Sequence, residues 1–293
     1  MNINQLKYLI TIANEQNISK AAEKLYVSQP SLSQCIHNIE KELGTKLFDR
    51  TKTPLKITYA GEVYIEWAKK VLNSYNEINT KIADISGQQN IRLIIGISSY
   101  RSTCILPPVI KEFKKLYPKC HIIIEEHPTP ILHKMMNEDK IDLLIDTPHP
   151  DTTTYKSIPL LNENILLEVP ENWHFKGKEI NLSDCANKPF IMLSKEQLLG
   201  KISRELCRKS NFEPNIALEC HNIETAHAFV TQGLGAAFVP ELFVKYRSQK
   251  TNFYKIKGYK TDRKFCVIYN KKKYLPKASE TFINILNNFL HEI

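Results

Sequence analysis

Long apolar runs are absent from this sequence of 293 residues. No stretch approaches the ~18 consecutive apolar residues that a membrane-spanning helix needs. Residues 1–10 contain regularly placed polar side chains and no small-residue cleavage site, so they do not form a signal peptide. We therefore predict a cytoplasmic protein with no membrane partner. Nine glycines and fifteen prolines also exclude a collagen-like or linker-dominated chain.

Closely spaced cysteines are absent as well. The seven cysteines are scattered, and none forms a Cys-x-x-Cys pair. This pattern is typical of reduced thiols in a cytosolic protein and gives no zinc site. A redox-sensing pair such as Cys207 and Cys220 is the alternative, although nothing near these residues marks a thiol of low pKa. The histidines lack the spacing of metal ligands too, so we predict neither a metal site nor a cofactor.

Enzyme motifs are also missing. The sequence has no G-x-S-x-G, H-E-x-x-H or P-loop pattern. Asp142 and Asp146 are spaced to share one face of a strand, but no nucleophile and base accompany them. Gly233-Leu234-Gly235 lacks the third glycine of a dinucleotide fingerprint and follows a predicted helix, which indicates a tight turn. We predict that the chain has no catalytic residues and is not an enzyme.

The charge that is present is mostly basic, with 40 Lys and Arg against 31 Asp and Glu. A net charge of +9 suggests nucleic acid or another polyanion as a partner. Residues 245–277 form the densest basic segment, with twelve basic residues and one acid. We interpret this segment as a solvated surface; an accessory DNA contact and the steering of an anionic ligand are the alternatives. The chain length itself predicts about two domains.

Residues 1–57 have the apolar spacing of short helices joined by tight turns. We expect Ser19 to cap the second helix and Ser28 to cap a third helix, which Gly44 ends. The apolar residues of this third helix are Leu32, Ile36, Ile39 and Leu43. Two helices joined by a tight turn form a helix-turn-helix. A helical hairpin that binds protein is the alternative, but it leaves the run of serine and glutamine at residues 28–34 unexplained.

Short apolar pieces around a basic turn at residues 47–58 predict a β-wing, and Thr58 then caps a long helix. Neither glycine nor proline occurs in the 25 residues from 62 to 86. One apolar stripe follows this helix and comprises Val63, Trp67, Val71, Tyr75, Ile78, Ile82 and Ile85. So long a stripe needs a partner, which predicts a coiled-coil dimer; packing on the helix's own domain is the alternative.

Beyond a predicted hinge at residues 87–90, short apolar strands alternate with helices, which predicts parallel βαβ units covered on both faces. The predicted strands are residues 92–97, 121–125, 142–146, 165–169, 190–193, 216–219, 236–239 and 265–269. The predicted helices are residues 106–117, 131–137, 197–210, 224–232 and 280–290. The length of this region suggests two lobes, and ligands bind such sheets beyond the carboxyl ends of the strands.

Residues 1–61 resemble the DNA-binding region of LysR-type transcriptional regulators. The resemblance is free of gaps and runs through Ser19, Ala21-Ala22, Leu25, Ser28-Gln29-Pro30-Ser31-Leu32-Ser33-Gln34, Ile36, Ile39-Glu40, Leu43-Gly44, Leu47-Phe48, Arg50, Thr58 and Ala60-Gly61. A looser resemblance covers the remainder, at Leu106-Pro107-Pro108, Ile141-Asp142 and Gly233-Leu234-Gly235 followed by Pro240.

The resemblance implies a multi-domain chain: an all-α winged helix-turn-helix with a long linker helix, then an α/β two-lobed domain similar to periplasmic binding proteins. Residues 1–58 would bind DNA, residues 59–87 would form the dimerisation helix and residues 88–293 would bind the effector. Lobe I would comprise residues 91–161 and 265–293, and lobe II residues 162–264. The family also implies assembly beyond the homodimer, into a homotetramer.

The N-terminus of a helix suits the major groove because its N–H groups face phosphate. The residues expected at the duplex are Ser28, Gln29, Pro30, Ser31, Ser33, Gln34 and His37 on the third helix, with Arg50 and Lys52 on the wing. Many family members have arginine where this chain has Gln34, so we expect relaxed or adenine-preferring readout there. The two wing residues would contact phosphates or the minor groove; a structural ion pair is the alternative for Arg50.

Hydroxyl and N–H groups at a helix N-terminus also suit a carboxylate or phosphate. Ser98, Ser99 and Arg101 follow the first strand after the hinge, and we predict that they contact the effector. The family resemblance adds Thr129 and Thr147 from the same lobe, and Ser194, with Gln197, from the opposite lobe. Each could instead be a helix cap or turn residue. Arg101 favours an anionic effector.

Together these observations predict a bacterial transcriptional regulator that binds double-stranded operator DNA as a dimer or tetramer. A small-molecule effector between two lobes would modulate that binding. The competing hypothesis is a small-molecule-binding protein or enzyme of α/β type with a helical extension. The helix-turn-helix match and the long apolar stripe argue against it.

Overall fold

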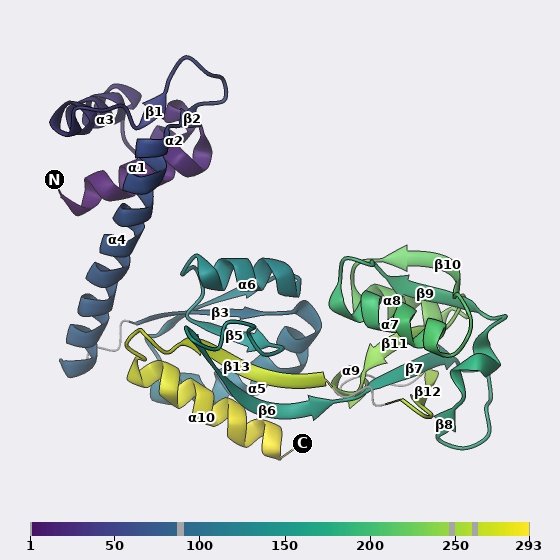
Figure 1. Ribbon diagram of the computed structural model, residues 1–293. Coiled ribbons are helices and arrows are strands. Elements are labelled where there is room, and N and C mark those ends of the chain that lie inside the picture. The colour runs from purple at the N-terminus through teal and green to yellow at the C-terminus, as the bar shows by residue number, and fades with distance from the viewer. Residues whose placement is uncertain (1, 87–90, 246–249, 260–262, 293) are drawn as a thin grey trace. The chain divides into compact units, whose positions relative to one another are not determined.

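The computed structural model describes residues 2–86, 91–245, 250–259 and 263–292, so the hinge predicted at residues 87–90 lies outside it. The chain divides into two compact units, Met1–Ile82 and Ala83–Ile293. Within the described ranges, every helix is too short or too polar to span a membrane. Figure 1 shows the elements of both units.

The first unit is a helical domain with a small two-stranded wing. Its described elements are α1 (Ile3–Glu15), α2 (Ile18–Lys24), α3 (Gln29–Leu43), β1 (Phe48–Asp49), β2 (Lys56–Ile57) and α4 (Tyr59–Ile85), whose last turn extends into the second unit. Apolar residues at helical spacing meet in one core, which includes Leu9, Ile12, Ala21, Leu32, Ile36 and Phe48. β1 and β2 pair antiparallel, as the sequence predicts for the wing.

Local sequence explains where these helices begin and end. The Ser28 hydroxyl accepts a hydrogen bond from the Ser31 N–H, and Gly44 ends α3 with a φ of 68°. The expectation that Ser19 caps α2 is wrong. The cap is Asn17, whose Oδ1 accepts from the Lys20 N–H at 3.0 Å, because Asn17 still has extended backbone while Ser19 already lies inside the helix.

The start of α4 is fixed against the wing by two features. The Thr58 hydroxyl accepts from the Gly61 N–H at 3.0 Å and donates to the Lys46 carbonyl at 2.7 Å. A Cβ added to Gly61 would lie 2.1 Å from the Leu47 carbonyl oxygen, so only glycine permits this approach.

The second unit contains two lobes, defined here by their sheets. Lobe I contains β3 (Arg92–Ile97), α5 (Ser99–Leu116), β4 (His121–Glu126), α6 (Thr129–Asn137), β5 (Leu143–Asp146), β6 (Tyr155–Glu163), β13 (Arg263–Asn270) and α10 (Lys277–His291). Its strands lie in the order β4-β3-β5-β13-β6. One apolar cluster joins α5 and α10 to the sheet and includes Leu143 and Ile145 of β5. α6 packs in a second cluster, which includes Leu144 of the same strand.

Lobe II contains β7 (Ile165–Pro170), β8 (Glu179–Ile180), a short 3-10 helix (Leu182–Cys185), β9 (Pro189–Leu193), α7 (Leu198–Lys209), β10 (Asn215–Cys220), α8 (Ile223–Thr231), β11 (Ala237–Pro240), α9 (Glu241–Lys245) and β12 (Thr251–Ile256). Its larger sheet has the order β11-β7-β12-β8, and β9 pairs parallel with β10. The chain passes from lobe I to lobe II between β6 and β7.

The sequence predicts eight of these strands, but it misses β6, β8, β12 and the short helix α9. Pro159 obscures β6, because proline has no N–H for a ladder. β6 tolerates it at the edge of the sheet, and the register of β13 shifts between Phe265 and Cys266 opposite it. The expectation of purely parallel units is partly wrong, since β13 runs antiparallel to both β5 and β6.

α5 begins seven residues before the predicted start at residue 106 and continues through Pro107 and Pro108. Proline disfavours a helix interior because it removes a hydrogen bond. Here the apolar face, which includes Cys104, Ile105 and Val109, is buried against the lobe I core. Tertiary packing therefore outweighs the local preference, and α5 extends back to the end of β3.

Candidate functional site

The N-terminal half of α3 presents a polar face to solvent. Of the residues predicted to contact DNA on this helix, Ser33 is half-buried, and the exposed ones are Ser28, Gln29, Pro30, Ser31, Gln34 and His37. Leu32 and Ile36 point the opposite way, into the core. The same helix therefore anchors the domain with one face and offers hydrogen-bonding groups with the other.

The glutamines on this face are held by neighbours one helical turn away. Gln29 Nε2 donates to Ser33 Oγ at 2.9 Å, and Gln34 Nε2 donates to Asn38 Oδ1 at 2.8 Å. Both bonds are exposed and involve no buried group. Each glutamine can therefore exchange its partner for a base edge at little cost.

The wing is attached to α3 through a buried carboxylate. Glu40 is 3% exposed, and its Oε1 accepts from the N–H groups of Leu47 and Phe48 at 2.8 and 3.2 Å. Its Oε2 lies 3.2 Å from Lys46 Nζ and 3.5 Å from Arg50 Nη2. The ion pair that the sequence leaves open for Arg50 is therefore present. Lys52 is exposed at the tip of the wing.

The stripe predicted along α4 is largely uncovered. Val63, Tyr75, Ile78 and Ile82 are 45–57% exposed, and Trp67 is 41% exposed. The opposite face buries Gly61, Ile65 and Ala68 in the first unit. Packing on its own domain, the alternative interpretation, accounts for the buried face but leaves the stripe without a partner among the described residues.

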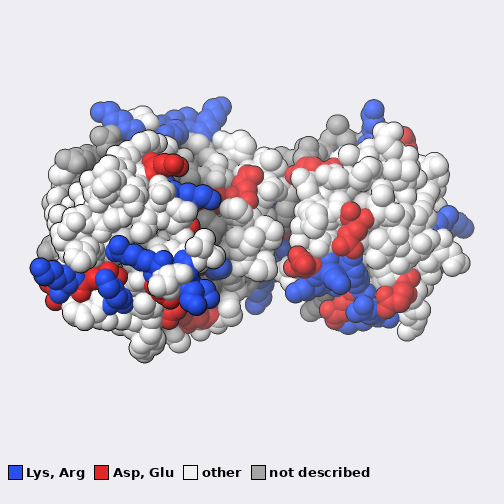
Figure 2. All heavy atoms as spheres, turned by 90° about the horizontal axis from the view of Figure 1, so that it is seen from above, with Lys and Arg blue, Asp and Glu red and all other residues white. Residues whose placement is uncertain are grey.

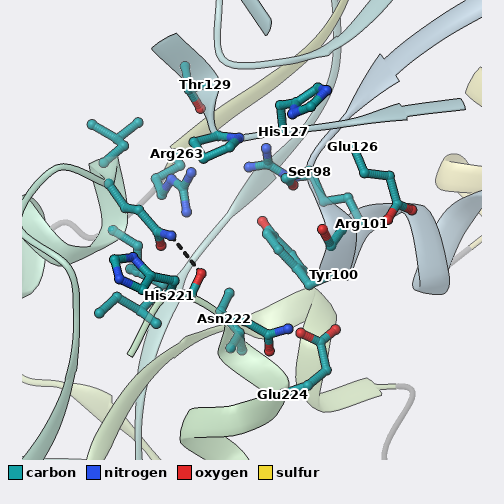
Figure 3. A pocket seen from close by; sticks show the side chains of 17 residues that line it. Ser98, Tyr100, Arg101, Glu126, His127, Thr129, His221, Asn222, Glu224 and Arg263 are labelled. Atoms are coloured by element: carbon teal, nitrogen blue, oxygen red, sulfur yellow. Dashed lines mark hydrogen bonds between the residues drawn. The ribbon is translucent and has the colours of Figure 1, made fainter. Parts of the chain in front are cut away.

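A pocket of about 140 Å³ lies between the two lobes of the second unit. Figure 3 shows polar side chains around it. It is lined by Ser98, Ser99, Tyr100, Arg101, Glu126, His127, Pro128, Thr129, Leu193, Gln197, Leu198, Leu199, His221, Asn222, Ile223, Glu224 and Arg263.

Four helices begin at this pocket, two from each lobe. Their N-caps are Ser98 of α5, Pro128 of α6, Gln197 of α7 and Asn222 of α8. Only the Asn222 side chain bonds a first-turn N–H group, so the other three helices leave their first N–H groups uncapped by side chains. Uncapped N–H groups and aligned helix dipoles favour negative charge at such a pocket, whereas Glu126 and Glu224 in the lining oppose it.

The pocket brings together most, but not all, of the predicted effector residues. Ser98, Ser99 and Thr129 line it with Gln197, whose Nε2 donates to the His221 carbonyl. The Ser98 hydroxyl is buried and has no hydrogen-bond partner in the described part of the chain.

Two predicted effector residues lie outside the pocket lining. The Thr147 N–H donates to Asp146 Oδ1 at 2.8 Å, and Ser194 Oγ accepts from the Glu196 N–H at 3.4 Å. Both match the alternative interpretation as turn residues. A Cβ on Gly200 would lie 2.1 Å from the Ser194 carbonyl oxygen, so this turn instead fixes the start of α7 at the pocket.

Arg101 also lines the pocket, but its charge is already neutralised. The side chain is 1% exposed; Nη1 donates to Asp146 Oδ1 at 3.0 Å and Nη2 to Glu163 Oε2 at 3.3 Å. Tyr100 Oη donates to the same Glu163 oxygen at 2.9 Å. Burial lowers the pKa of Arg101, but the neighbouring acidic groups outweigh it and raise that pKa above its usual value. Arg101 thus joins α5, β5 and β6 through its two terminal nitrogens. Its contact with an anionic effector stays a prediction.

Arg263, which the sequence prediction omitted, is the cation better placed for a ligand. It begins β13, faces the pocket, and its Nε is buried without a hydrogen-bond partner in the described ranges. The sequence prediction also omitted His127, His221 and Asn222. The rule that ligands bind beyond the carboxyl ends of strands could have identified these three, because they directly follow β4 and β10.

Buried polar atoms without partners concentrate near the pocket. Of the eight such atoms in the described part of the chain, five belong to Ser98, Arg101, Asp146, Glu163 and Arg263. Buried polar groups are normally hydrogen-bonded. Their concentration here indicates a place that a ligand or ordered water completes.

The described residues give little support for thiol or metal chemistry. Burial raises the pKa of the Cys207 thiol to about 12, which opposes a reactive thiolate there. Among the described residues, no group of three or more His, Cys, Asp and Glu side chains could hold a metal ion. On the face seen in Figure 2, lysine and arginine are interspersed with acidic residues.

Comparison with protein families gives two matches. Residues 3–62 match the bacterial regulatory helix-turn-helix proteins of the lysR family, and residues 86–290 match the LysR substrate binding domain. A probable RuBisCO transcriptional regulator of Trieres chinensis is 30% identical, with 97% of this chain and 96% of the relative aligned. The HTH-type transcriptional regulator BsdA of Bacillus subtilis is 28% identical, over 97% of this chain and all of the relative.

Solved structures share the fold. A full-length OxyR variant from Pseudomonas aeruginosa has a TM-score of 0.73 and 22% identity, covering 98% of both chains. Full-length CbnR in complex with its target DNA has a TM-score of 0.66 and 21% identity, covering 98% of this chain and 99% of that one.

The Arg101 network predicts a folding role for this residue. Replacing Arg101 with methionine should destabilise the second unit by about 3–5 kcal/mol, because two buried carboxylates lose their cation. The exposed neighbour Ser99 provides the control, since Ser99→Ala should change stability by less than about 0.5 kcal/mol. Denaturant unfolding of the full chain measures both. An unchanged midpoint for Arg101→Met would show that the guanidinium is not needed for folding and is free to serve a ligand.

Proposed function

Because the chain belongs to the LysR family of transcriptional regulators and carries that family's effector-binding domain, we propose that it binds operator DNA through α3 and the wing. We also propose that it acts as a cytoplasmic homodimer whose DNA binding responds to a small anionic effector in the interlobe pocket. The observation that carries DNA binding is the exposed polar face at the N-terminus of α3, opposite a face buried in the core.

Gln29 and Gln34 are the proposed base readers. Glutamine can bond adenine N6 and N7 in a bidentate manner. Gln34 lies one turn beyond Pro30, on the exposed face, and its amide is held only by Asn38. Ser28, Ser31 and Ser33 would then contact phosphates or base edges, with His37 at the far end of the same face.

The two basic wing residues differ in their proposed roles. Lys52 is an exposed charge that can neutralise a phosphate. Arg50 is 40% exposed and paired with the buried Glu40, so it orients the wing and can contribute to DNA contact from that position. The wing therefore has one residue that holds it and one that meets the duplex.

The proposed dimer is built on α4. Its uncovered stripe continues over several turns, from Val63 to Ile85. A second copy of the same helix offers the matching stripe, and pairing the two would remove large apolar side chains from water. Assembly into a tetramer is proposed from the family alone.

The size and chemistry of the pocket limit the effector. A cavity of about 140 Å³ is close to the ~150 Å³ that holds a benzene molecule. Three uncapped helix N-termini, the Ser98 hydroxyl and Arg263 all favour a ligand with negative charge. We therefore propose a small carboxylate or phosphate held by Ser98, Ser99, Thr129, Gln197 and Arg263.

Lobe closure is the proposed link between the pocket and DNA. Tyr100 and Arg101, which line the pocket, bond Glu163 at the end of β6, just before the chain passes to lobe II. A ligand can shift the balance between two lobe arrangements only by its difference in affinity for them. Contacts from both lobes to one ligand supply such a difference.

Nuclease footprinting of the purified full-length protein tests the proposal directly. On DNA upstream of its own and neighbouring genes, with competitor DNA present, we expect protection over several helical turns, because more than one dimer or half-site is engaged. Binding that is absent even at low salt would contradict a DNA-binding regulator and favour a small-molecule-binding protein.

Two variants separate base readout from phosphate contact. Gln34→Ala should cost about 1–3 kcal/mol at one base pair of each half-site and leave other positions unchanged. Lys52→Ala should weaken binding to all sequences alike and lower the slope of log Kd against log salt by about 1 per lysine. Equal loss on every sequence for Gln34→Ala, or an unchanged slope for Lys52→Ala, would remove that residue from its assigned role.

The effector pocket is tested by screening small carboxylates and phosphates for a change in the footprint. Arg263→Gln should weaken the response to an active compound about tenfold or more, because a charge-assisted hydrogen bond is lost. DNA affinity without the compound should persist. The adjacent exposed residue gives the control, Lys264→Gln, which should respond like the unmodified protein. A full response from Arg263→Gln would place the anion elsewhere.

A further inference from the structure

Tyr26, in the turn between α2 and α3, has a backbone conformation that suits its residue type poorly. Its φ is +55°, in the left-handed region. Leu25 is the C-cap of α2, so Tyr26 occupies the next position, where glycine is usual. The three other described non-glycine residues with positive φ are Gln16, Asp139 and Asn211, all polar. A bulky aromatic residue with this φ is a genuine outlier.

The fold requires this backbone, but not this side chain. The Tyr26 N–H donates to the Glu23 carbonyl and the Val27 N–H to the Ala22 carbonyl, both at 3.1 Å. Glycine would form both bonds with less strain. The Tyr26 side chain is 97% exposed, more than any other large apolar or aromatic side chain in the described part of the chain. Packing inside the domain therefore does not compensate for the strain.

The position of the residue indicates what its side chain meets. Tyr26 lies two residues before Ser28, the N-cap of α3, so the two Cα atoms are at most roughly 7 Å apart. Beyond Ser28 lies the polar face that the proposed function places in the major groove. Phosphates border that groove, and tyrosine hydroxyls are among the groups that bond them.

We propose that Tyr26 is a DNA-backbone contact, whose phenol donates a hydrogen bond to a phosphate beside the groove that α3 enters. The inference rests on the proposed DNA binding. Strain at an exposed, functional position is a recognised arrangement, because the residue is retained for what it contacts. A phosphate contact positions the protein and carries no base preference.

A neutral phenol differs from lysine in one measurable way. Lysine releases a condensed counterion when it neutralises a phosphate, whereas a phenol adds no charge and releases none. Tyr26→Phe should therefore weaken binding without changing its salt dependence. This signature separates Tyr26 from Lys52, for which affinity and salt slope fall together.

The test uses the full-length protein on an operator fragment defined by its footprint and on an unrelated duplex of equal length. Fluorescence anisotropy gives Kd over a range of salt concentrations. For Tyr26→Phe we expect about tenfold weaker binding to both duplexes, with an unchanged salt slope, because a hydrogen bond to a charged group is lost. Tyr26→Gly should bind as weakly and have a higher Tm.

A matched control comes from Gln16, which ends α1 with a φ of +50°. Gln16→Gly should also raise Tm but leave DNA affinity unchanged. If Tyr26→Phe binds like the unmodified protein, the inference is overturned, whatever Tyr26→Gly does, while the proposed function stands. A loss confined to certain base sequences would also overturn it, because that would indicate base readout. If the unmodified protein shows no specific binding, it is the proposed function that fails.

Discussion

A buried guanidinium must be neutralised where it lies, and Arg101 meets this requirement by joining three elements that are distant in sequence. Its partners come from the end of β5 and the end of β6, and its own helix begins at the pocket. The Phe265 ring, from the returning strand β13, packs 4.6 Å from the guanidinium carbon. Arg101 at the pocket and Glu163, at the end of β6 where the chain passes to lobe II, thus belong to one ion-pair network. Displacement of one member of this network changes the environment of the others.

The sequence predicted most of the fold because local and tertiary preferences agree along most of the chain. β3 has the predicted bounds, and both ends of α3 follow from Ser28 and Gly44. The failures occur where packing overrides local preference. α5 begins before its predicted start at residue 106, and β6, which contains Pro159, was not predicted. Burial of the surrounding apolar residues stabilises both elements.

The candidate sites were less predictable than the fold, and for a different reason. Residue type identifies a group that could bind a ligand, but not whether another residue already occupies it. Arg101 and Arg263 have the same chemistry in the sequence; only the structure shows that two carboxylates hold the terminal nitrogens of Arg101, while Arg263 lines the pocket at the start of β13. The strand ends that carry His127 and His221 were visible in the sequence, since both follow predicted strands.

The edge strand β6 has a consequence for the behaviour of the protein in a crowded solution. An edge strand offers unpaired N–H and C=O groups on which a strand from another chain can add. Pro159 has no N–H to offer to any ladder, and the register shift opposite it interrupts the regular pairing of β6 with β13. β6 is thereby a poor template for pairing with a strand from another chain.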